Sequence, residues 1–115
     1  MAGFTCDIQK TPNGVIVIRT KGYFDDEGGE VFRGKVEPLV QQGERKFLLN
    51  FKDSPLINST GISVLIELAE EITSMPNGKV AFCGLSKAVD SVFRMMGLTT
   101  AFPVYDTEEN AVAKI

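Results

Sequence analysis

The sequence predicts a small α/β sandwich, in which a mixed and mostly parallel sheet of about five strands packs against four helices. Two observations predict this fold. From residue 31 onward, segments with helical periodicity alternate with short apolar segments, which is the pattern of parallel strands joined by crossover helices. Before them, two strand-like segments flank a turn. The length of 115 residues suits one domain that spans residues 1–115.

The first two strands are expected to form an antiparallel hairpin. From Phe4 to Gln9, apolar and polar residues alternate, which is the period of a half-buried strand. The sequence TPNG at 11–14 supplies turn residues, and the β-branched run VIVIRT at 15–20 follows it.

A helix is expected next, although its sequence is a poor helix former. Asp25, Asp26 and Glu27 stand at its start, where the helix dipole favours acids. Several glycines lower its propensity, and Pro38 is expected to kink the helix or to mark its boundary. The apolar residues that recur at helical spacing are Val31, Phe32, Val36, Leu39 and Val40.

The middle of the chain carries the clearest patterns. KFLLNF at 46–51 is a nearly continuous apolar run, as expected for a strand near the sheet centre with both faces covered. A helix then begins near Ser59, and MPNG at 75–78 ends it. Its apolar face follows the i, i+3, i+4, i+7 rule and consists of Ile62, Leu65, Ile66, Ala69 and Ile72.

Two further strand and helix pairs complete the fold. KVAFCG at 79–84 is a strand, and Ser86 can cap a helix that closes at Gly97. One face of that helix is expected to carry Val89, Val92, Phe93 and Met96. FPVY at 102–105 suits a short edge strand, and Thr107 can cap a last helix.

Composition and charge exclude several classes of function. The net charge of −3 and the scattered basic residues argue against a direct nucleic-acid partner, because phosphate binding needs a clustered positive surface. The apolar runs are too short to cross a bilayer, and the first residues lack the pattern of a signal peptide. We therefore expect a cytoplasmic protein with no membrane contact.

The chain contains no histidine, which argues against an enzyme. Ser-His-Asp and Cys-His catalysis and the usual zinc ligand sets are then impossible, and no nucleotide-binding motif follows a strand. Cys6 and Cys83 are expected to be buried thiols. The acids at 25–27 are interpreted as complements of the helix dipole and not as metal ligands. We therefore expect neither a metal nor a cofactor.

The turn LINSTGISVL at 56–65 places small polar residues at the start of the predicted helix. The simplest interpretation is capping, in which Asn58 or Ser59 accepts a hydrogen bond from a free amide, worth about 1 kcal/mol. The functional alternative is that a hydroxyl carries a phosphate, which the amides and the dipole of a helix start stabilise. A partner fitted to the neutral turn would then meet about two negative charges and bind less well.

Three stretches carry a family resemblance: GYFDDEGGEVFRGKVEPLV, FLLNFKDSPLINSTGISVLIELAEEI and VAFCGLSKAVDSVFRMMGLTTAFPVYDTEENAV. They resemble the STAS family, named for sulfate transporters and anti-sigma factor antagonists. The most specific element is the turn, where the family commonly reads D-S-S-G or D-S-[ST]-G. Two further family patterns add support: G-x-[LF]-D at Gly22 to Asp25, and the ending GL..AFPVYDTEE, whose last residue is Glu109. The resemblance covers nearly the whole chain and implies a single STAS domain of the anti-sigma factor antagonist type.

The resemblance implies a non-enzymatic bacterial switch that regulates transcription. Unphosphorylated antagonists of this family bind an anti-sigma factor that is also a serine kinase, and so free a sigma factor. The kinase phosphorylates the antagonist with ATP, and a metal-dependent phosphatase of the PP2C type reverses this. The motif assigns the phosphate to Ser59, with Thr60 as the secondary candidate. The implied partner-binding residues are Asp25, Asn58, Ser59, Thr60 and Gly61, where the glycine would allow close approach of a partner or kinase.

Asn58 departs from the motif, because the best-studied antagonists carry aspartate there. Asparagine keeps the capping oxygen and removes a negative charge beside the acceptor. The alternative function is therefore a docking or scaffold module of a bacterial signalling complex that is not phosphorylated. The family resemblance also raises weak nucleotide binding, and a monomer or weak dimer is expected.

Overall fold

The sheet has the strand order β1-β2-β3-β4-β5, so that each strand lies beside its neighbour in the sequence. The structure is a computed structural model that describes residues 3–115. The strands are β1 Thr5–Lys10, β2 Val15–Lys21, β3 Lys46–Asp53, β4 Lys79–Cys83 and β5 Val104–Tyr105. The first two form the predicted antiparallel hairpin and all later pairings are parallel, which confirms the mixed, mostly parallel sheet.

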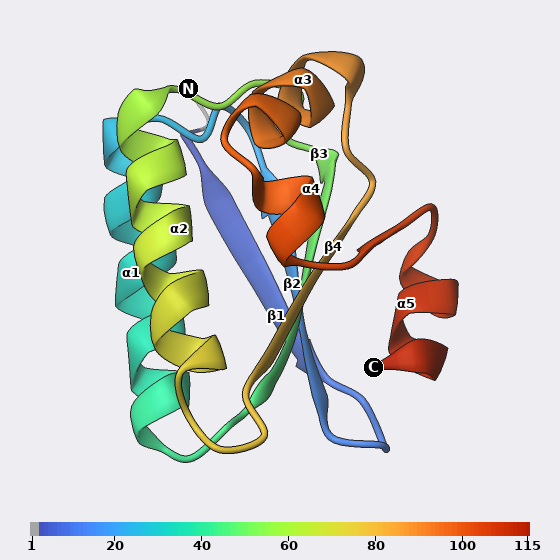
Figure 1. Cartoon of the computed structure of the whole chain (residues 1–115). Helices are drawn as coiled ribbons and strands as arrows, with labels where there is room; N and C mark the ends of the chain where they lie inside the picture. Colours follow the sequence, from blue (N-terminus) through green and yellow to red (C-terminus); the bar gives the residue numbers. More distant parts are fainter. Residues whose placement is uncertain (1–2) are drawn as a thin grey trace.

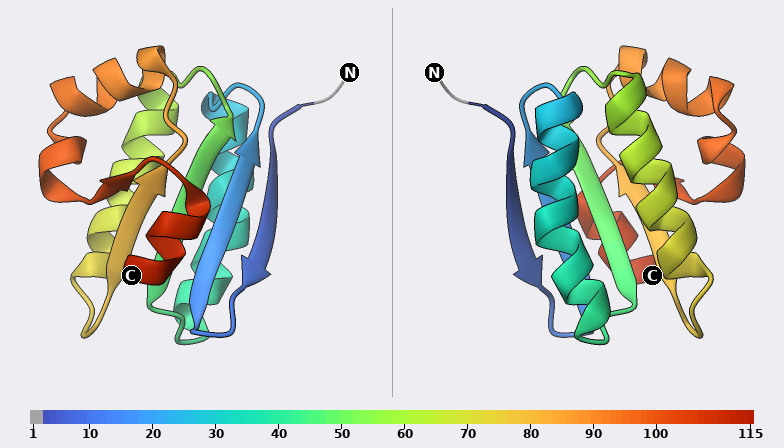
Figure 2. Two further views of the ribbon diagram at one scale, coloured as in Figure 1. Left: turned by 90° about the vertical axis from the view of Figure 1, so that its right-hand side faces the viewer. Right: turned by 90° about the vertical axis from the view of Figure 1, so that its left-hand side faces the viewer.

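Five helices accompany the sheet within the described residues. They are α1 Asp26–Gln41, α2 Ser59–Thr73, α3 Lys87–Met95, α4 Leu98–Ala101 and α5 Glu108–Lys114. Helices α1 and α2 lie side by side on one face, and α5 covers the other face (Figure 1, Figure 2). The prediction of four helices misses α4, a single turn that begins after Gly97, whose φ of 77° redirects the chain. None of the helices within residues 3–115 has the length and apolarity to cross a bilayer.

The middle of strand β3 is apolar because both of its faces are covered there. Phe47, Leu49 and Phe51 belong to the larger core beneath α1 and α2, and Leu48 belongs to the smaller core beneath α5. The central position predicted for this strand is confirmed.

Phenylalanine rings form a continuous chain through the larger core. The ring centroid of Phe24 lies 4.7 Å from that of Phe4 and 6.1 Å from that of Phe51. Phe51 in turn lies 5.5 Å from Phe93, which is 5.0 Å from Phe82. Tilted and edge-on arrangements of this kind are the favourable ones for aromatic pairs. This chain of rings fixes Phe24 at one end of the sheet, where the segment after β2 meets α2.

One of the two alternatives at Pro38 and the placement of Met96 are wrong. Pro38 does not mark a helix boundary, because α1 continues to Gln41 and the Pro38 carbonyl accepts a hydrogen bond from the Gln42 amide. Met96 does not join the buried face of α3, because the helix ends at Met95 and leaves Met96 52% exposed. Val89 and Phe93 are buried as predicted.

Both cysteines are buried free thiols, as expected. Cys6 belongs to the larger core and Cys83 to the smaller one, on opposite faces of the sheet. Burial raises the pKa of each thiol to about 11. Neither is therefore a thiolate at neutral pH.

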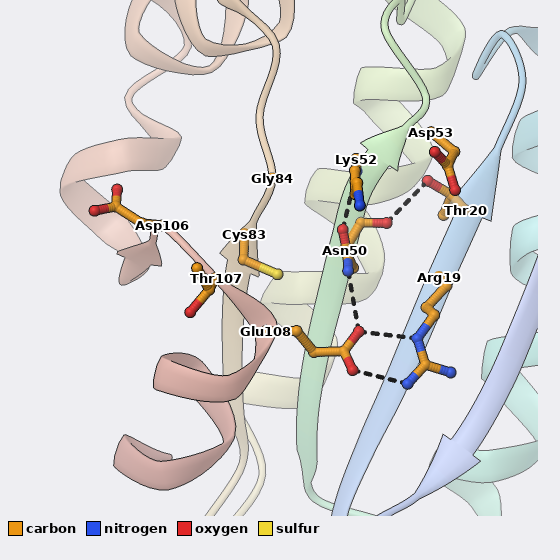
Figure 3. A pocket seen from close by; sticks show the side chains of 10 residues that line it. All are labelled: Arg19, Thr20, Asn50, Lys52, Asp53, Cys83, Gly84, Asp106, Thr107 and Glu108. Carbon is orange, nitrogen blue, oxygen red and sulfur yellow. Dashed lines mark hydrogen bonds and ion pairs between the residues drawn. The ribbon is translucent and has the colours of Figure 1, made fainter.

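Helix α5 is held to its face of the sheet by a charged network (Figure 3). The Arg19 guanidinium donates to both carboxylate oxygens of Glu108, at 2.9 Å from Nε and 2.7 Å from Nη2. The Asn50 amide also donates to Glu108, at 3.0 Å. The hydrogen bond from Arg19, more than that from Asn50, lowers the pKa of Glu108. Thr107 caps α5 as predicted.

We expect Glu108→Gln to lower the free energy of unfolding at neutral pH by about 0.2–1 kcal/mol, because it removes a partly exposed ion pair. A carboxylate whose native pKa is lowered stabilises the fold above its unfolded pKa and loses this effect as the pH falls through the native value. The difference between the two proteins should therefore vanish in acid. Urea unfolding from about pH 2 to about pH 7 measures it.

Glu109→Gln is the matched control, because Glu109 lies in the same helical turn and is exposed. Equal losses for both variants, or a loss at Glu108 that does not change with pH, would show that the Arg19 pair does not hold the helix.

Candidate functional site

The turn at 56–61 lies where the chain leaves β3 and enters α2. It is joined to the segment between β2 and α1 by an isolated parallel bridge between Phe24 and Ile57. The Phe24 amide donates to the Leu56 carbonyl at 3.0 Å, and the Asn58 amide donates to the Phe24 carbonyl at 3.1 Å. Because each bridged segment leads directly into a helix, the starts of α1 and α2 lie side by side.

Both helix starts are capped by side chains that the sequence analysis singled out. The Oδ1 atom of Asn58 accepts a hydrogen bond from the Gly61 amide at 2.9 Å, which identifies Asn58 and not Ser59 as the cap of α2. The Oδ1 atom of Asp25 accepts from the Gly28 amide at 2.9 Å and caps α1. The capping interpretation is therefore confirmed at Asn58.

Asp26 belongs to this site, although the sequence analysis gave it only a dipole role. The Nδ2 atom of Asn58 donates to Oδ1 of Asp26 at 2.9 Å. Hydrogen bonds from Asn58 and, second, from the Thr60 side chain lower the pKa of Asp26. The two residues are 32 positions apart, and no local signal in the sequence pairs them.

Ser59 and Thr60 differ in their surroundings. Both side chains are exposed in the first turn of α2. The Thr60 side chain faces the Asp26 carboxylate closely enough to help lower its pKa. The backbone carbonyl of Ser59 accepts a hydrogen bond from the Ser63 hydroxyl at 2.9 Å. Because the Ser59 side chain is exposed, an external enzyme can reach its hydroxyl without unfolding the turn.

Gly61 allows α2 to begin directly against the backbone of Phe24. A Cβ atom at this position would lie 2.2 Å from the Phe24 carbonyl oxygen and 2.7 Å from its ring atom Cδ1. Such distances do not occur between non-bonded atoms, so only glycine fits. Gly61 is itself buried, and the close approach that it permits is within the fold. Its assignment as a partner-binding residue remains a prediction.

Two exposed apolar side chains flank the polar turn. Tyr23 is 48% exposed and Leu56 is 53% exposed. Each precedes a residue of the bridge, so that they point outward where Phe24 and Ile57 point inward. Exposed aromatic and aliphatic residues beside polar ones are typical of surfaces that bind other proteins.

A separate cavity of about 630 Å³ opens on the α5 side of the sheet, at the carboxyl ends of β2, β3 and β4 (Figure 3). Two of its charged groups, Arg19 and Glu108, bind each other, and the buried Thr20 hydroxyl donates to Ser54 at 2.7 Å. No sequence motif predicts a function for this cavity. Within residues 3–115, no group of three cysteine or acidic side chains is arranged to hold a metal ion.

Comparison with known proteins shows similarity along nearly the whole chain. The STAS domain family model matches residues 8–111. The chain is 24% identical over 103 residues to the anti-sigma F factor antagonist of Paenibacillus polymyxa, with 89% of this chain and 87% of the relative covered.

Solved structures show the same fold. The crystal structure of an anti-sigma factor antagonist from Mycobacterium paratuberculosis has a TM-score of 0.88 at 17% identity, covering 98% of this chain and 94% of that one. SpoIIAA of Bacillus, in its phosphorylated form, has a TM-score of 0.78 at 22% identity, covering 96% of this chain and 98% of that one.

We expect Gly61→Ala to destabilise the protein by about 1–3 kcal/mol or more, because the added methyl must displace the Phe24 backbone. Gly34→Ala in α1 is the matched control, since its new methyl would meet nothing within 4 Å. Replacing a glycine inside a helix should stabilise the control by about 0.5–1 kcal/mol. Urea unfolding measures both, and a harmless Gly61→Ala would contradict the close contact.

Proposed function

The chain belongs to the STAS domain family, and we propose that it is an anti-sigma factor antagonist that phosphorylation of Ser59 switches off. The observation that carries the proposal is the exposed Ser59 in the first turn of α2, immediately after the Asn58 cap. The names of the sequence relative and of the structural neighbours support the antagonist role. In this role the domain acts by binding and catalyses no reaction.

The unphosphorylated surface is the one that we expect to bind the anti-sigma factor. It combines the polar residues Asn58, Ser59 and Thr60 with the exposed side chains of Tyr23 and Leu56. Asp25 lies on the adjoining helix start and contributes to the edge of this surface. Apolar anchors surrounded by polar groups are the usual composition of a protein interface.

The switching reaction transfers a phosphoryl group from ATP to Ser59. The bond from the Ser59 Oγ atom to phosphorus forms as the bond to the leaving ADP breaks, and the hydroxyl proton passes to a base of the kinase. A metal-dependent phosphatase of the PP2C type restores the hydroxyl with water and releases inorganic phosphate. Both enzymes would act in the bacterial cytoplasm, and the antagonist would work as a monomer or weak dimer.

A phosphate on Ser59 suits the fold but not the complex. The start of a helix stabilises added negative charge, so α2 remains folded. At the interface, the same group brings about two negative charges that the partner must desolvate. The modification therefore lowers affinity without unfolding the domain.

We expect Ser59→Asp to weaken binding to the anti-sigma kinase of the source bacterium at least tenfold, which corresponds to about 1.4 kcal/mol. Ser59→Ala should bind as the unphosphorylated protein does and should remain bound after incubation with ATP. Isothermal titration calorimetry measures both affinities. Ser74→Asp is the charge-matched control, because Ser74 lies at the opposite end of α2 and should leave affinity unchanged.

Unchanged affinity for both Ser59 variants would favour the alternative, a docking module that binds without phosphorylation. The replacement of the motif aspartate by Asn58 is the observation that keeps this alternative in view. Peptide mass spectrometry of the protein from its source cells, in growth and under stress, decides the same question. A phosphate on Ser59 whose occupancy changes with conditions supports the switch, and its absence under all conditions rejects it.

A further inference from the structure

Asp26 connects the starts of the two helices that form the proposed site. Its carboxylate, from the first turn of α1, accepts a hydrogen bond from the Asn58 side chain at 2.9 Å. The side chain of Thr60 in α2 lies near enough to help lower the pKa of the same carboxylate. Asn58 and Thr60 are the immediate neighbours of Ser59 in the sequence, one on each side.

Apart from the dipole of its own helix, Asp26 has little around it that compensates for more negative charge. Asp25 and Glu27 are its neighbours in the chain, and both are acidic. None of the ion pairs found within residues 3–115 includes Asp26. Beyond its own helix start, the carboxylate therefore depends on the side-chain donor of Asn58.

A phosphate on Ser59 would act on this arrangement in two ways. Its oxygens are strong acceptors that can take the Asn58 donor from Asp26. Its charge also repels the Asp26 carboxylate. Both effects weaken the hydrogen bond between Asn58 and Asp26.

We propose that Asp26 senses the state of Ser59: it holds the Asn58 side chain while Ser59 is neutral, and loses it when Ser59 carries a phosphate. The inference rests on the proposed function, because it takes Ser59 as the phosphorylated residue. It adds a second change to the proposed interface. The first turn of α1 loses its hydrogen bond to Asn58 at the same time as Ser59 of α2 gains its phosphate. The partner would then meet a surface altered on both helices.

A double-mutant cycle tests the coupling without any partner or kinase. Ser59→Asp introduces the charge and Ser59→Asn is its neutral counterpart, and each is made with Asp26 or with Asp26→Asn. Relative to Ser59→Asn, Ser59→Asp should raise the unfolding equilibrium constant by some factor. That factor should be roughly twice as large with Asp26 as with Asp26→Asn. The excess should largely disappear at about 1 M salt. Both positions are exposed, so all the variants are expected to fold.

Nuclear magnetic resonance gives an independent readout at the carboxyl carbon of Asp26. Its pKa should rise in Ser59→Asp, and rise further in protein that carries phosphoserine at position 59, because two acceptors then compete for the same donor.

Glu30→Gln is the matched control in the double-mutant cycle. Glu30 is an exposed acid one turn further along α1, and it should show no coupling to position 59.

The outcomes separate this inference from the proposed function. An unchanged Asp26 pKa, or coupling as large at Glu30 as at Asp26, overturns the sensing role even if Ser59→Asp still weakens partner binding. Coupling at Asp26 alone, together with the shifted pKa, supports the sensing role. If Ser59→Asp then leaves the affinity for the partner unchanged, the proposed switch function is rejected, and the electrostatic coupling between Asp26 and position 59 is retained.

Discussion

The site depends on the contact between the start of α2 and the backbone of Phe24. Gly61 leaves no room for a side chain there, and the Phe24 carbonyl accepts a hydrogen bond from the Asn58 amide. Phe24 is in turn fixed by a chain of buried rings that crosses the larger core. The position of an exposed surface turn is thereby set by the packing of the protein interior.

The parallel sheet explains why the residues of the site come from distant parts of the chain. Strands β2 and β3 are adjacent and run in the same direction, so the helices that follow them begin at the same end of the sheet. Two helix starts side by side bring together two dipoles and two caps. The hydrogen bond from Asn58 to Asp26 joins these starts and links the site across both helices.

The sequence predicted the parts of this structure that have local signals. The strands, the amphipathic face of α2 and the caps at Ser86 and Thr107 follow from residues within one or two turns of each other. The pairs Asn58 with Asp26 and Arg19 with Glu108 lie 32 and 89 positions apart, and only the folded sheet brings them together. The short helix α4 and the exposure of Met96 depend on the path after Gly97, which helical periodicity does not describe.

At the bridge between Phe24 and Ile57, adjacent residues have different roles. Phe24 and Ile57 pack inward, while the preceding residues Tyr23 and Leu56 point to the solvent. A substitution at either outward position changes the proposed docking surface and leaves the chain of rings intact. Duplicated copies of such a domain can therefore diverge in the partners they recognise, and so be insulated from one another in one cell, while the architecture beneath stays the same.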